Sequence, residues 1–260
     1  MIAIWIVIAL FAVGDTAAGI PKNAAPPSTA QHRRHRLARR RPFGGRPMKL
    51  YASPFACSFT VRVALAEAGL GAEIVWVDLK TKRTADGTDL TRLNPKGQVP
   101  TLVLDDRAVL TEIGAILQHI GDRVPALPLV PPPASFERYR LQEWLSFIAS
   151  EIHKTLGVLL ITAPILDPAG SDVTRRLAYH LLPARLDHVA RALDGGSFLM
   201  GEYFTVADAY LFNMLIWARY AEFDLTPWPA IGAYFTRLAA RPAIAPVLAQ
   251  ERDARVASQR

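Results

Sequence analysis

Cys57 is the single cysteine in a chain of 260 residues, and it stands directly before a segment whose apolar side chains recur at helical spacing. A thiol at the start of a helix meets unpaired backbone N–H groups and the positive end of the helix dipole, and both lower its pKa. The position predicts an active thiol with a pKa below the reference of about 8.5. The alternative is a small buried apolar residue, which is the role of most isolated cysteines. One cysteine excludes an internal disulfide, a CxxC dithiol and a cysteine-cluster zinc site.

Other polar residues could share this chemistry, and each has a structural alternative. Ser58 is either a rival for Cys57 or a plain helix N-cap. Glu112 and Ile113 begin a predicted helix, whose N-terminal N–H groups suit a carboxylate, although Glu112 can also be a favourable first-turn acid. His153 and Lys154 lie on a long predicted helix, where His153 is a candidate donor or a histidine bonded to a backbone carbonyl. The other histidines of residues 48–260 show no metal-ligand spacing, so no metal is expected.

The first half of the chain must position Cys57 and Glu112. Its apolar patterns predict a helix after Cys57 that ends at Gly69, and a helix capped by Thr111 with an apolar face that includes Ile116, Leu117 and Ile120. Residues 80–93 are polar and irregular, and residues 94–98 form a turn cluster. Four strands are expected, at residues 49–52, 73–78, 101–104 and 108–110.

The second half shows only helical signals. Residues 126–133 contain four prolines and predict a linker. Thr205 and Asp208 are spaced for a capping box, with Asp in place of Glu. Pro183 should bend or break the helix that contains it. The helices are expected at residues 135–160, 172–193, from 204 onward, 229–240 and 243–251.

The fold class predicted from these elements is an α/β module followed by an all-helical domain. The expected boundaries are a leader at 1–47, an α/β domain at 48–125, the linker at 126–133 and a helical domain at 134–255. The chain contains no repeat, no GxGxxG and no P-loop.

The leader carries the charge imbalance of the chain. Residues 1–47 hold eight basic residues and one acid, so the net charge of +7 belongs to them, and residues 48–260 hold 22 of each sign. The body therefore has no basic excess to attract nucleic acid or anionic lipid. Residues 2–13 form an apolar run that is too short to span a bilayer, which needs about 20 residues. Three interpretations stay open: translation that truly starts at Met48, an export or membrane-tethering leader, and a basic arm that binds nucleic acid.

From Met48 onward the chain resembles the glutathione S-transferases, most of all the bacterial beta class. The resemblance covers about four-fifths of the chain. It rests on these strings: Met48-Lys49-Leu50-Tyr51, Ala56-Cys57-Ser58, Val77-Asp78-Leu79-Lys80, Asn94-Pro95-Lys96-Gly97-Gln98-Val99-Pro100, Leu110-Thr111-Glu112, Ala115-Ile116-Leu117-Gln118, Glu151-Ile152-His153-Lys154 and Phe204-Thr205-Val206-Ala207-Asp208-Ala209-Tyr210.

This resemblance implies a thioredoxin-like N-terminal domain, an all-α C-terminal domain, a homodimer and glutathione as co-substrate. Attack of the glutathione thiolate on small electrophiles is the implied activity, together with glutathione-dependent thiol–disulfide exchange through Cys57. The implied catalytic residues are Cys57, His153 and Ser58. The implied glutathione-binding residues are Cys57, Lys82, Val99, Glu112, Ile113, Ser146, His153 and Lys154.

The resemblance gives several of these residues a specific role. Val99 precedes a cis proline and pairs with the cysteinyl backbone of glutathione, Lys82 reaches the glycyl carboxylate, and Glu112 holds the γ-glutamyl ammonium. Ile113 departs from the family, where a small or hydroxyl residue is usual, so only its backbone N–H remains as a donor. Apolar residues should line the electrophile site, namely Pro54, Phe55, Leu156, Leu159 and Leu160.

The second functional hypothesis is a non-catalytic glutathione- or ligand-binding protein on the same fold. Ile113 favours it, whereas Cys57, Lys82, Glu112 and His153 together favour the enzyme. Neither nucleic acid nor a membrane is expected as a partner of the body. A cytoplasmic location is expected, with export or tethering if the apolar leader is genuine.

Overall fold

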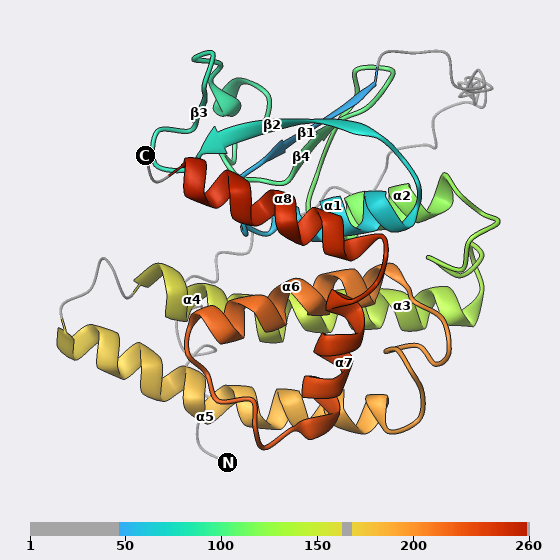
Figure 1. Ribbon diagram of the computed structural model, residues 1–260, viewed down its shortest axis with the longest axis vertical. Coiled ribbons are helices and arrows are strands. Elements are labelled where there is room, and N and C mark those ends of the chain that lie inside the picture. Colours follow the sequence, from blue (N-terminus) through green and yellow to red (C-terminus); the bar gives the residue numbers. More distant parts are fainter. Residues whose placement is uncertain (1–46, 163–167, 259–260) are drawn as a thin grey trace, which may run out of the picture. The chain divides into compact units, whose positions relative to one another are not determined.

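The computed structural model describes residues 47–162 and 168–258. Apart from Pro47, the leader predicted at residues 1–47 lies outside the described residues. Residues 48–122 form a five-stranded mixed sheet with two helices, and the following residues form helices α3 to α8 (Figure 1). The strands are β1 (Met48–Ala52), β2 (Ala72–Asp78), β3 (Arg83–Thr84), β4 (Thr101–Val103) and β5 (Val109–Thr111). The helices are α1 (Ser58–Glu67), α2 (Ile113–Asp122), α3 (Phe136–Phe147), α4 (Lys154–Thr162), α5 (Pro168–Leu193), α6 (Val206–Tyr220), α7 (Pro229–Ala239) and α8 (Ile244–Ala257).

The sheet has the strand order β3-β2-β1-β4-β5. Strands β1 and β2 run parallel and are joined by α1, which is the crossover that a parallel pair requires. The other pairs are antiparallel. Side chains alternate across β1, so that Met48, Leu50 and Ala52 all point into the core. This confirms the thioredoxin-like module that was expected.

Helix α1 lies at the centre of the described molecule. It packs against α2, α6 and α8, and Figure 1 shows α1 and α8 between the sheet and the helices α3, α4 and α6. Its first eight residues are all buried, which explains why its sequence is apolar around most of its circumference. The loop before α1, which carries Cys57, is therefore fixed from both sides.

The long helix expected at residues 135–160 is interrupted. It begins as predicted, since the Ser135 hydroxyl accepts a hydrogen bond from Arg138 N–H at 3.1 Å. Residues Ile148–His153 then form π-helical turns between α3 and α4. Such turns hold an extra residue and often occur at functional sites, and these end at His153.

Helix α5 runs from Pro168 to Leu193 through Pro183, so of the bend or break expected at this proline the break does not occur. Proline removes one backbone hydrogen bond, but buried Leu182, Leu186 and Val189 hold the surrounding turns in place. Within the irregular region 80–93 the structure contains a short strand, β3, and a 3-10 turn at Leu90–Arg92. Both were too short to leave a periodic pattern.

The start of α6 matches the prediction. The capping box is formed, and the Asp208 carboxylate accepts from the Thr205 backbone N–H at 2.8 Å and from its hydroxyl at 2.9 Å. Buried Tyr234 of α7 donates to the same carboxylate at 2.8 Å. This carboxylate thus joins the first turn of α6 to α7.

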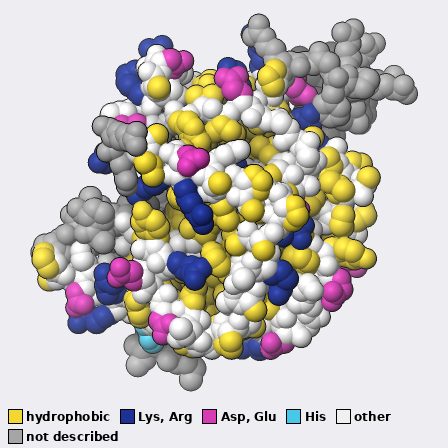
Figure 2. All heavy atoms as spheres, viewed as in Figure 1, with side chains coloured by type: hydrophobic (Ala, Val, Ile, Leu, Met, Phe, Trp, Pro, Cys, Tyr) yellow, Lys and Arg dark blue, Asp and Glu magenta, His cyan; other side chains and the backbone are white. Residues whose placement is uncertain are grey.

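The surface of the described residues carries no single basic field on the face shown in Figure 2, where Lys and Arg side chains are interspersed with Asp and Glu. This agrees with the charge balance of residues 48–260. Across the described ranges, no helix has both the length and the apolar character needed to cross a membrane.

Candidate active site

A pocket of about 800 Å³ opens between the loop before α1 and the helices α4, α6 and α8. One wall comes from the α/β module and the other from the helical domain. The pocket is lined by Ser53, Pro54, Phe55, Ala56, Cys57, Leu79, Lys82, Gly97, Gln98, Val99, Ala149, His153, Lys154, Gly157, Val158, Leu160, Ile216, Trp217, Tyr220 and Arg255.

Helices α6 and α8 hold the backbone of the loop that carries Cys57. Phe55 N–H donates to the Glu251 carboxylate at 2.6 Å, and the Phe55 carbonyl accepts from the Trp217 indole at 2.8 Å. The amide of Asn213 donates to the Ala56 carbonyl at 3.2 Å. These bonds stabilise Phe55 in a positive-φ conformation, at 54°, which is rare for residues other than glycine. The helical domain thus sets the position of the thiol-bearing loop.

The Glu251 carboxylate is itself fixed by a buried ion pair. Arg62 of α1 donates to it at 2.5 Å, and both side chains are almost fully buried. Burial raises the pKa of the Glu251 carboxyl, while the Phe55 N–H and the Arg62 guanidinium act in the opposite direction. Arg62 and Glu251 thus support the pocket wall, but neither side chain lines the pocket.

Cys57 is the N-cap residue of α1, so it lies at the start of this helix as predicted. Its Sγ donates a hydrogen bond to the Val99 carbonyl oxygen at 2.8 Å. Burial raises the pKa of the Cys57 thiol to about 12, the nearby Glu112 charge adds to the rise, and backbone N–H groups at the start of α1 only partly offset it. The expectation of a pKa below 8.5 was therefore wrong, because the cost of desolvating the thiolate exceeds the stabilisation by the helix terminus.

Ser58 does not reach the pocket. It is fully buried, and its hydroxyl accepts from Ser53 N–H at 3.1 Å and donates to the Ser53 carbonyl at 3.2 Å. These two bonds close the loop over residues 53–58. The structure gives Ser58 a role in holding the loop and does not place it beside Cys57 as a second reacting group.

His153 lines the pocket at the end of the π-helical turns. Its Nδ1 lies 2.7 Å from the Tyr210 hydroxyl, and its ring packs edge-on against Trp217 at a centroid distance of 4.9 Å. Burial lowers the pKa of His153 to about 4, and the adjacent Lys154 charge contributes. Burial, Cys57 and Glu112 raise the pKa of the Tyr210 hydroxyl. The pair is therefore a neutral imidazole bonded to a protonated phenol.

Glu112 and Ile113 lie where α2 begins. Glu112 is the N-cap residue, has a φ of 70° and pairs with Lys96, which also donates to the Thr111 hydroxyl at 2.7 Å. The cap expected at Thr111 is thus one residue later. The Ile113 side chain is buried and packs in the core, so it offers no side-chain group at this helix end. The strained, exposed Glu112 is typical of a residue held for binding.

The remaining expected binding residues divide into two groups. Lys82 and Lys154 line the pocket, and the Lys82 side chain lies close to Gly97, whose φ of 59° favours glycine. Val99 also lines it, and the Val99–Pro100 peptide bond is cis, as the resemblance implied. Ser146 lies exposed on α3 and is not part of the lining, so the structure does not bring it to this pocket.

Comparisons with known proteins agree with this geometry. The family model described as "Glutathione S-transferase, N-terminal domain" matches residues 52–123, and "Glutathione S-transferase, C-terminal domain" matches residues 180–237. A glutathione S-transferase of Escherichia coli is 39% identical over 204 residues, which cover 78% of this chain and 98% of the relative. One of Xanthomonas campestris is 36% identical over 74% of this chain and 93% of its own length.

Solved structures give the same result. A glutathione transferase from Methylococcus capsulatus is 48% identical with a TM-score of 0.73, covering 78% of this chain and 98% of its own. A sphingomonad glutathione S-transferase complexed with glutathione is 41% identical with a TM-score of 0.72 and the same coverage. The chain belongs to the glutathione S-transferase family.

Family membership confirms the fold class and the enzyme class that the sequence suggested. Details of the electrophile wall differ from the expectation. Pro54, Phe55 and Leu160 line the pocket, but Leu156 and Leu159 are buried in the core, and Gly157 and Val158 take their places. The π-helical turns shift the helical phase, which a regular period of 3.6 residues could not foresee.

Three positions at this glutathione S-transferase site were missed from the sequence. Tyr210 was not among the expected site residues, although its hydroxyl bonds His153. Glu251 and Arg255 lie on α8, beyond the last strong motif, and α8 extends to Ala257 rather than ending at Glu251. A spacing of four residues places Glu251 and Arg255 on one helix face, which was the available signal.

Proposed function

We propose that this glutathione S-transferase conjugates glutathione to small electrophiles, with Cys57 and His153 as hydrogen-bond donors to the glutathione sulfur. The observation that carries the proposal is the Cys57 thiol at the N-terminus of α1, which donates to the Val99 carbonyl at 2.8 Å in a pocket that His153 also lines. Donors that face a developing thiolate lower its pKa without becoming charged themselves. Glutathione binds here as co-substrate.

Tyr210 fixes the tautomer of His153 in this proposal. Because the Tyr210 pKa is raised, its hydroxyl stays protonated and donates to His153 Nδ1 across the 2.7 Å contact. The imidazole then carries its hydrogen on Nε2, which is the atom left to donate to the glutathione sulfur. Tyr210 is a positioning residue, since it acts through His153.

The reaction then needs few steps. The glutathione thiol loses its proton to water, and its thiolate accepts hydrogen bonds from Cys57 and His153. The sulfur attacks an electrophilic carbon held against the apolar wall of Phe55, Val158 and Trp217. A C–S bond forms, and the leaving group departs with the electron pair of the bond that breaks. Alignment in the pocket supplies the proximity that this bimolecular step needs.

Glutathione itself is held, in this proposal, by residues of the α/β module together with Lys154 of α4. Lys82 and Lys154 bind the glycyl carboxylate, Val99 pairs with the cysteinyl backbone, and Glu112 binds the γ-glutamyl ammonium above the Ile113 N–H. Among the described residues, Val99 already accepts from Cys57, so glutathione binding would exchange that contact for one with the substrate sulfur. Thiol–disulfide exchange through Cys57 is disfavoured, because a pKa of about 12 leaves little thiolate near neutral pH.

The test is a glutathione-affinity column followed by a turnover assay with chlorodinitrobenzene. Retention with turnover supports the transferase. Retention without turnover on several electrophiles would instead support the non-catalytic binder.

Tyr210→Phe should lower kcat with little change in the KM for glutathione, because the imidazole stays in place but loses its fixed tautomer.

A homodimer is proposed on family grounds. Phe136 and Tyr139 of α3 are 65% and 58% exposed, and such exposed aromatic residues are frequent at protein–protein interfaces. Sedimentation velocity at micromolar concentration should report a dimer, and a monomer would contradict the proposal.

A further inference from the structure

Cations line the pocket. Lys82, Lys154 and Arg255 contribute to its lining, whereas no Asp or Glu among the described residues does. Within residues 47–162 and 168–258, none of these three side chains forms an ion pair. By contrast, the buried arginines Arg62 and Arg138 each pair with a carboxylate. Free cations around an apolar pocket attract an anionic ligand.

Arg255 of α8 lines this pocket. It is one helical turn beyond Glu251, which binds Phe55 N–H, so both residues lie on the same face of α8. The guanidinium donates to the Tyr220 hydroxyl at 3.2 Å and lies over the Tyr220 ring, 5.6 Å from its centroid. Its Nε is buried and has no hydrogen-bond partner among the described residues. A buried, unpaired donor at a pocket wall is costly unless a ligand satisfies it.

Glutathione does not account for this arginine. In the proposed function the glycyl carboxylate is held by Lys82 and Lys154. Arg255 instead contacts Tyr220, which lines the pocket together with Phe55 and Trp217, the aromatic residues of the wall assigned to the second substrate. The charge of Arg255 is thus left for that substrate.

We propose that the second substrate is an apolar electrophile that carries a carboxylate, and that Arg255 binds this carboxylate. The inference rests on the proposed function, because it assigns the remaining half of the same pocket. A guanidinium matches a carboxylate in shape and offers parallel N–H donors. With a chlorodinitrobenzoate, the glutathione sulfur bonds to the carbon that carries chlorine, chloride leaves with the electron pair of the broken bond, and the carboxylate is unchanged.

The experiment compares two electrophiles that differ only in charge. A chlorodinitrobenzoate with its carboxylate para to chlorine is matched by the corresponding neutral chlorodinitrobenzamide. Arg255→Gln should lower kcat/KM for the benzoate by about 10- to 100-fold and leave the benzamide within about twofold, as expected for loss of a charged hydrogen bond. Arg255→Lys should recover part of the benzoate rate. The matched control is Arg252→Gln, an exposed arginine of α8 that does not line the pocket.

A binding readout separates this inference from the proposed function. Titration calorimetry of S-(para-carboxybenzyl)glutathione and S-(para-carbamoylbenzyl)glutathione requires no turnover. Arg255→Gln should weaken binding of the carboxylate conjugate by about tenfold or more and leave the amide conjugate unchanged. Equal effects on both conjugates, or none on either, would overturn the inference even if the wild-type enzyme turns over both electrophiles. Selective weakening in a protein without turnover would uphold the anion site and overturn the proposed catalysis.

Discussion

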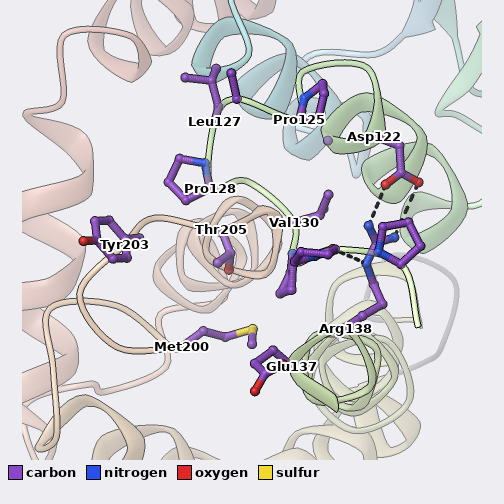
Figure 3. A pocket seen from close by; sticks show the side chains of 15 residues that line it. Asp122, Pro125, Leu127, Pro128, Val130, Glu137, Arg138, Met200, Tyr203 and Thr205 are labelled. Atoms are coloured by element: carbon purple, nitrogen blue, oxygen red, sulfur yellow. Dashed lines mark hydrogen bonds and ion pairs between the residues drawn. The ribbon is translucent and has the colours of Figure 1, made fainter. Parts of the chain in front are cut away.

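Two pockets of similar volume lie on opposite parts of this fold. One, of about 800 Å³, holds Cys57 and His153. The other, of about 780 Å³, is formed by the proline-rich segment after α2, the first turn of α3 and the loop before α6 (Figure 3). We name it the linker pocket; it is lined by Gly121, Asp122, Pro125, Ala126, Leu127, Pro128, Val130, Pro131, Pro132, Pro133, Glu137, Arg138, Met200, Tyr203 and Thr205.

In the linker pocket, Arg138, Asp122 and Thr205 already have protein partners. Arg138 donates to Asp122 at 2.5 Å and to the Pro131 carbonyl at 2.7 Å, and Figure 3 shows Asp122 and Arg138 facing each other. The Thr205 hydroxyl donates to Asp208 at 2.9 Å. The rest of the lining is mainly proline and aliphatic side chains (Figure 3). These contacts fix the path of the chain between α2 and α3.

The Cys57 pocket has the opposite character. Arg255 keeps an unpaired Nε, Lys82 and Lys154 form no ion pair among the described residues, and His153 is a neutral imidazole. The difference teaches that volume does not identify the active site. The active site is identified instead by polar groups that have no partner within the protein, because these groups retain the capacity to bind a substrate. Substitutions in the two pockets should accordingly change different properties, activity in one and stability in the other.

The largest expected effect concerns the reactivity of Cys57. With a pKa of about 12, its thiolate fraction near neutral pH is about 1000-fold below that of a free cysteine, so alkylation by iodoacetamide should slow by about that factor. Mass spectrometry of the native protein against the same chain in denaturant measures the ratio. Equal rates, or a stable mixed disulfide with oxidised glutathione, would show that Cys57 is a reactive thiolate after all.

The next effect is the pH dependence of stability. His153 has a pKa of about 4 when folded and about 6.5 when unfolded, so the unfolded chain binds the proton first. This group contributes roughly 3 kcal/mol to the free energy of unfolding above pH 6.5, and that contribution is lost as the pH falls from 6.5 towards 4. Urea unfolding of wild type and His153→Gln across this range isolates it. An identical pH slope in both proteins would contradict the lowered pKa.

The effect of His153 substitution on activity should be somewhat smaller, when it is expressed as a free energy, than the effect of His153 protonation on stability. His153→Ala removes one donor to the thiolate and should lower kcat/KM by about 100-fold, as loss of one transition-state hydrogen bond does elsewhere. His153→Gln retains an amide donor and should recover part of the rate. Because the imidazole is neutral, wild-type kcat/KM should show no His153 titration between about pH 5 and pH 8. A loss of activity with an apparent pKa near 6.5 would contradict this assignment.

The comparison also shows what the sequence can reveal. Strand and helix periodicity and the capping box at Thr205 led to the fold class and the position of Cys57 before a helix, whereas the binding role of Lys82 came from the family resemblance. Periodicity and the capping box are local signals, since each depends on neighbours within a few residues. The assignment of His153 to the same site as Cys57 depended on the family resemblance.

The failures have a common physical cause. The pKa of Cys57 depends on burial by segments more than 40 residues away, such as Val99 and α6. The partnership of Tyr210 with His153 spans 57 residues, and that of Glu251 with Phe55 spans 196. Tertiary contacts of this kind leave no periodicity in the chain. The π-helical turns before His153 broke the one period on which the expected electrophile wall relied.

In the linker pocket, Arg138→Ala should lower stability and spare activity. It leaves Asp122 without its partner and the Pro131 carbonyl without a donor, so the free energy of unfolding should fall by about 2 kcal/mol, less than for a fully buried pair because Asp122 is 46% exposed. Arg140→Ala, which removes an exposed pair with Glu143, should cost less than about 0.5 kcal/mol. A drop in kcat/KM at full folding would link the linker pocket to catalysis and weaken the comparison.

The smallest expected effect is that of removing residues 1–47. Both pockets are built from residues after Met48, and β1 begins at Met48, whose side chain is 4% exposed. A chain that starts there should keep the kcat/KM, the glutathione affinity and the Tm of the full chain. What should change is ionic binding, because the net charge falls from +7 to zero, and retention on a cation exchanger should drop accordingly. Aggregation or loss of glutathione binding would show that residues 1–47 support the fold. Mass spectrometry of the native N-terminus would distinguish initiation at Met48 from cleavage of a leader.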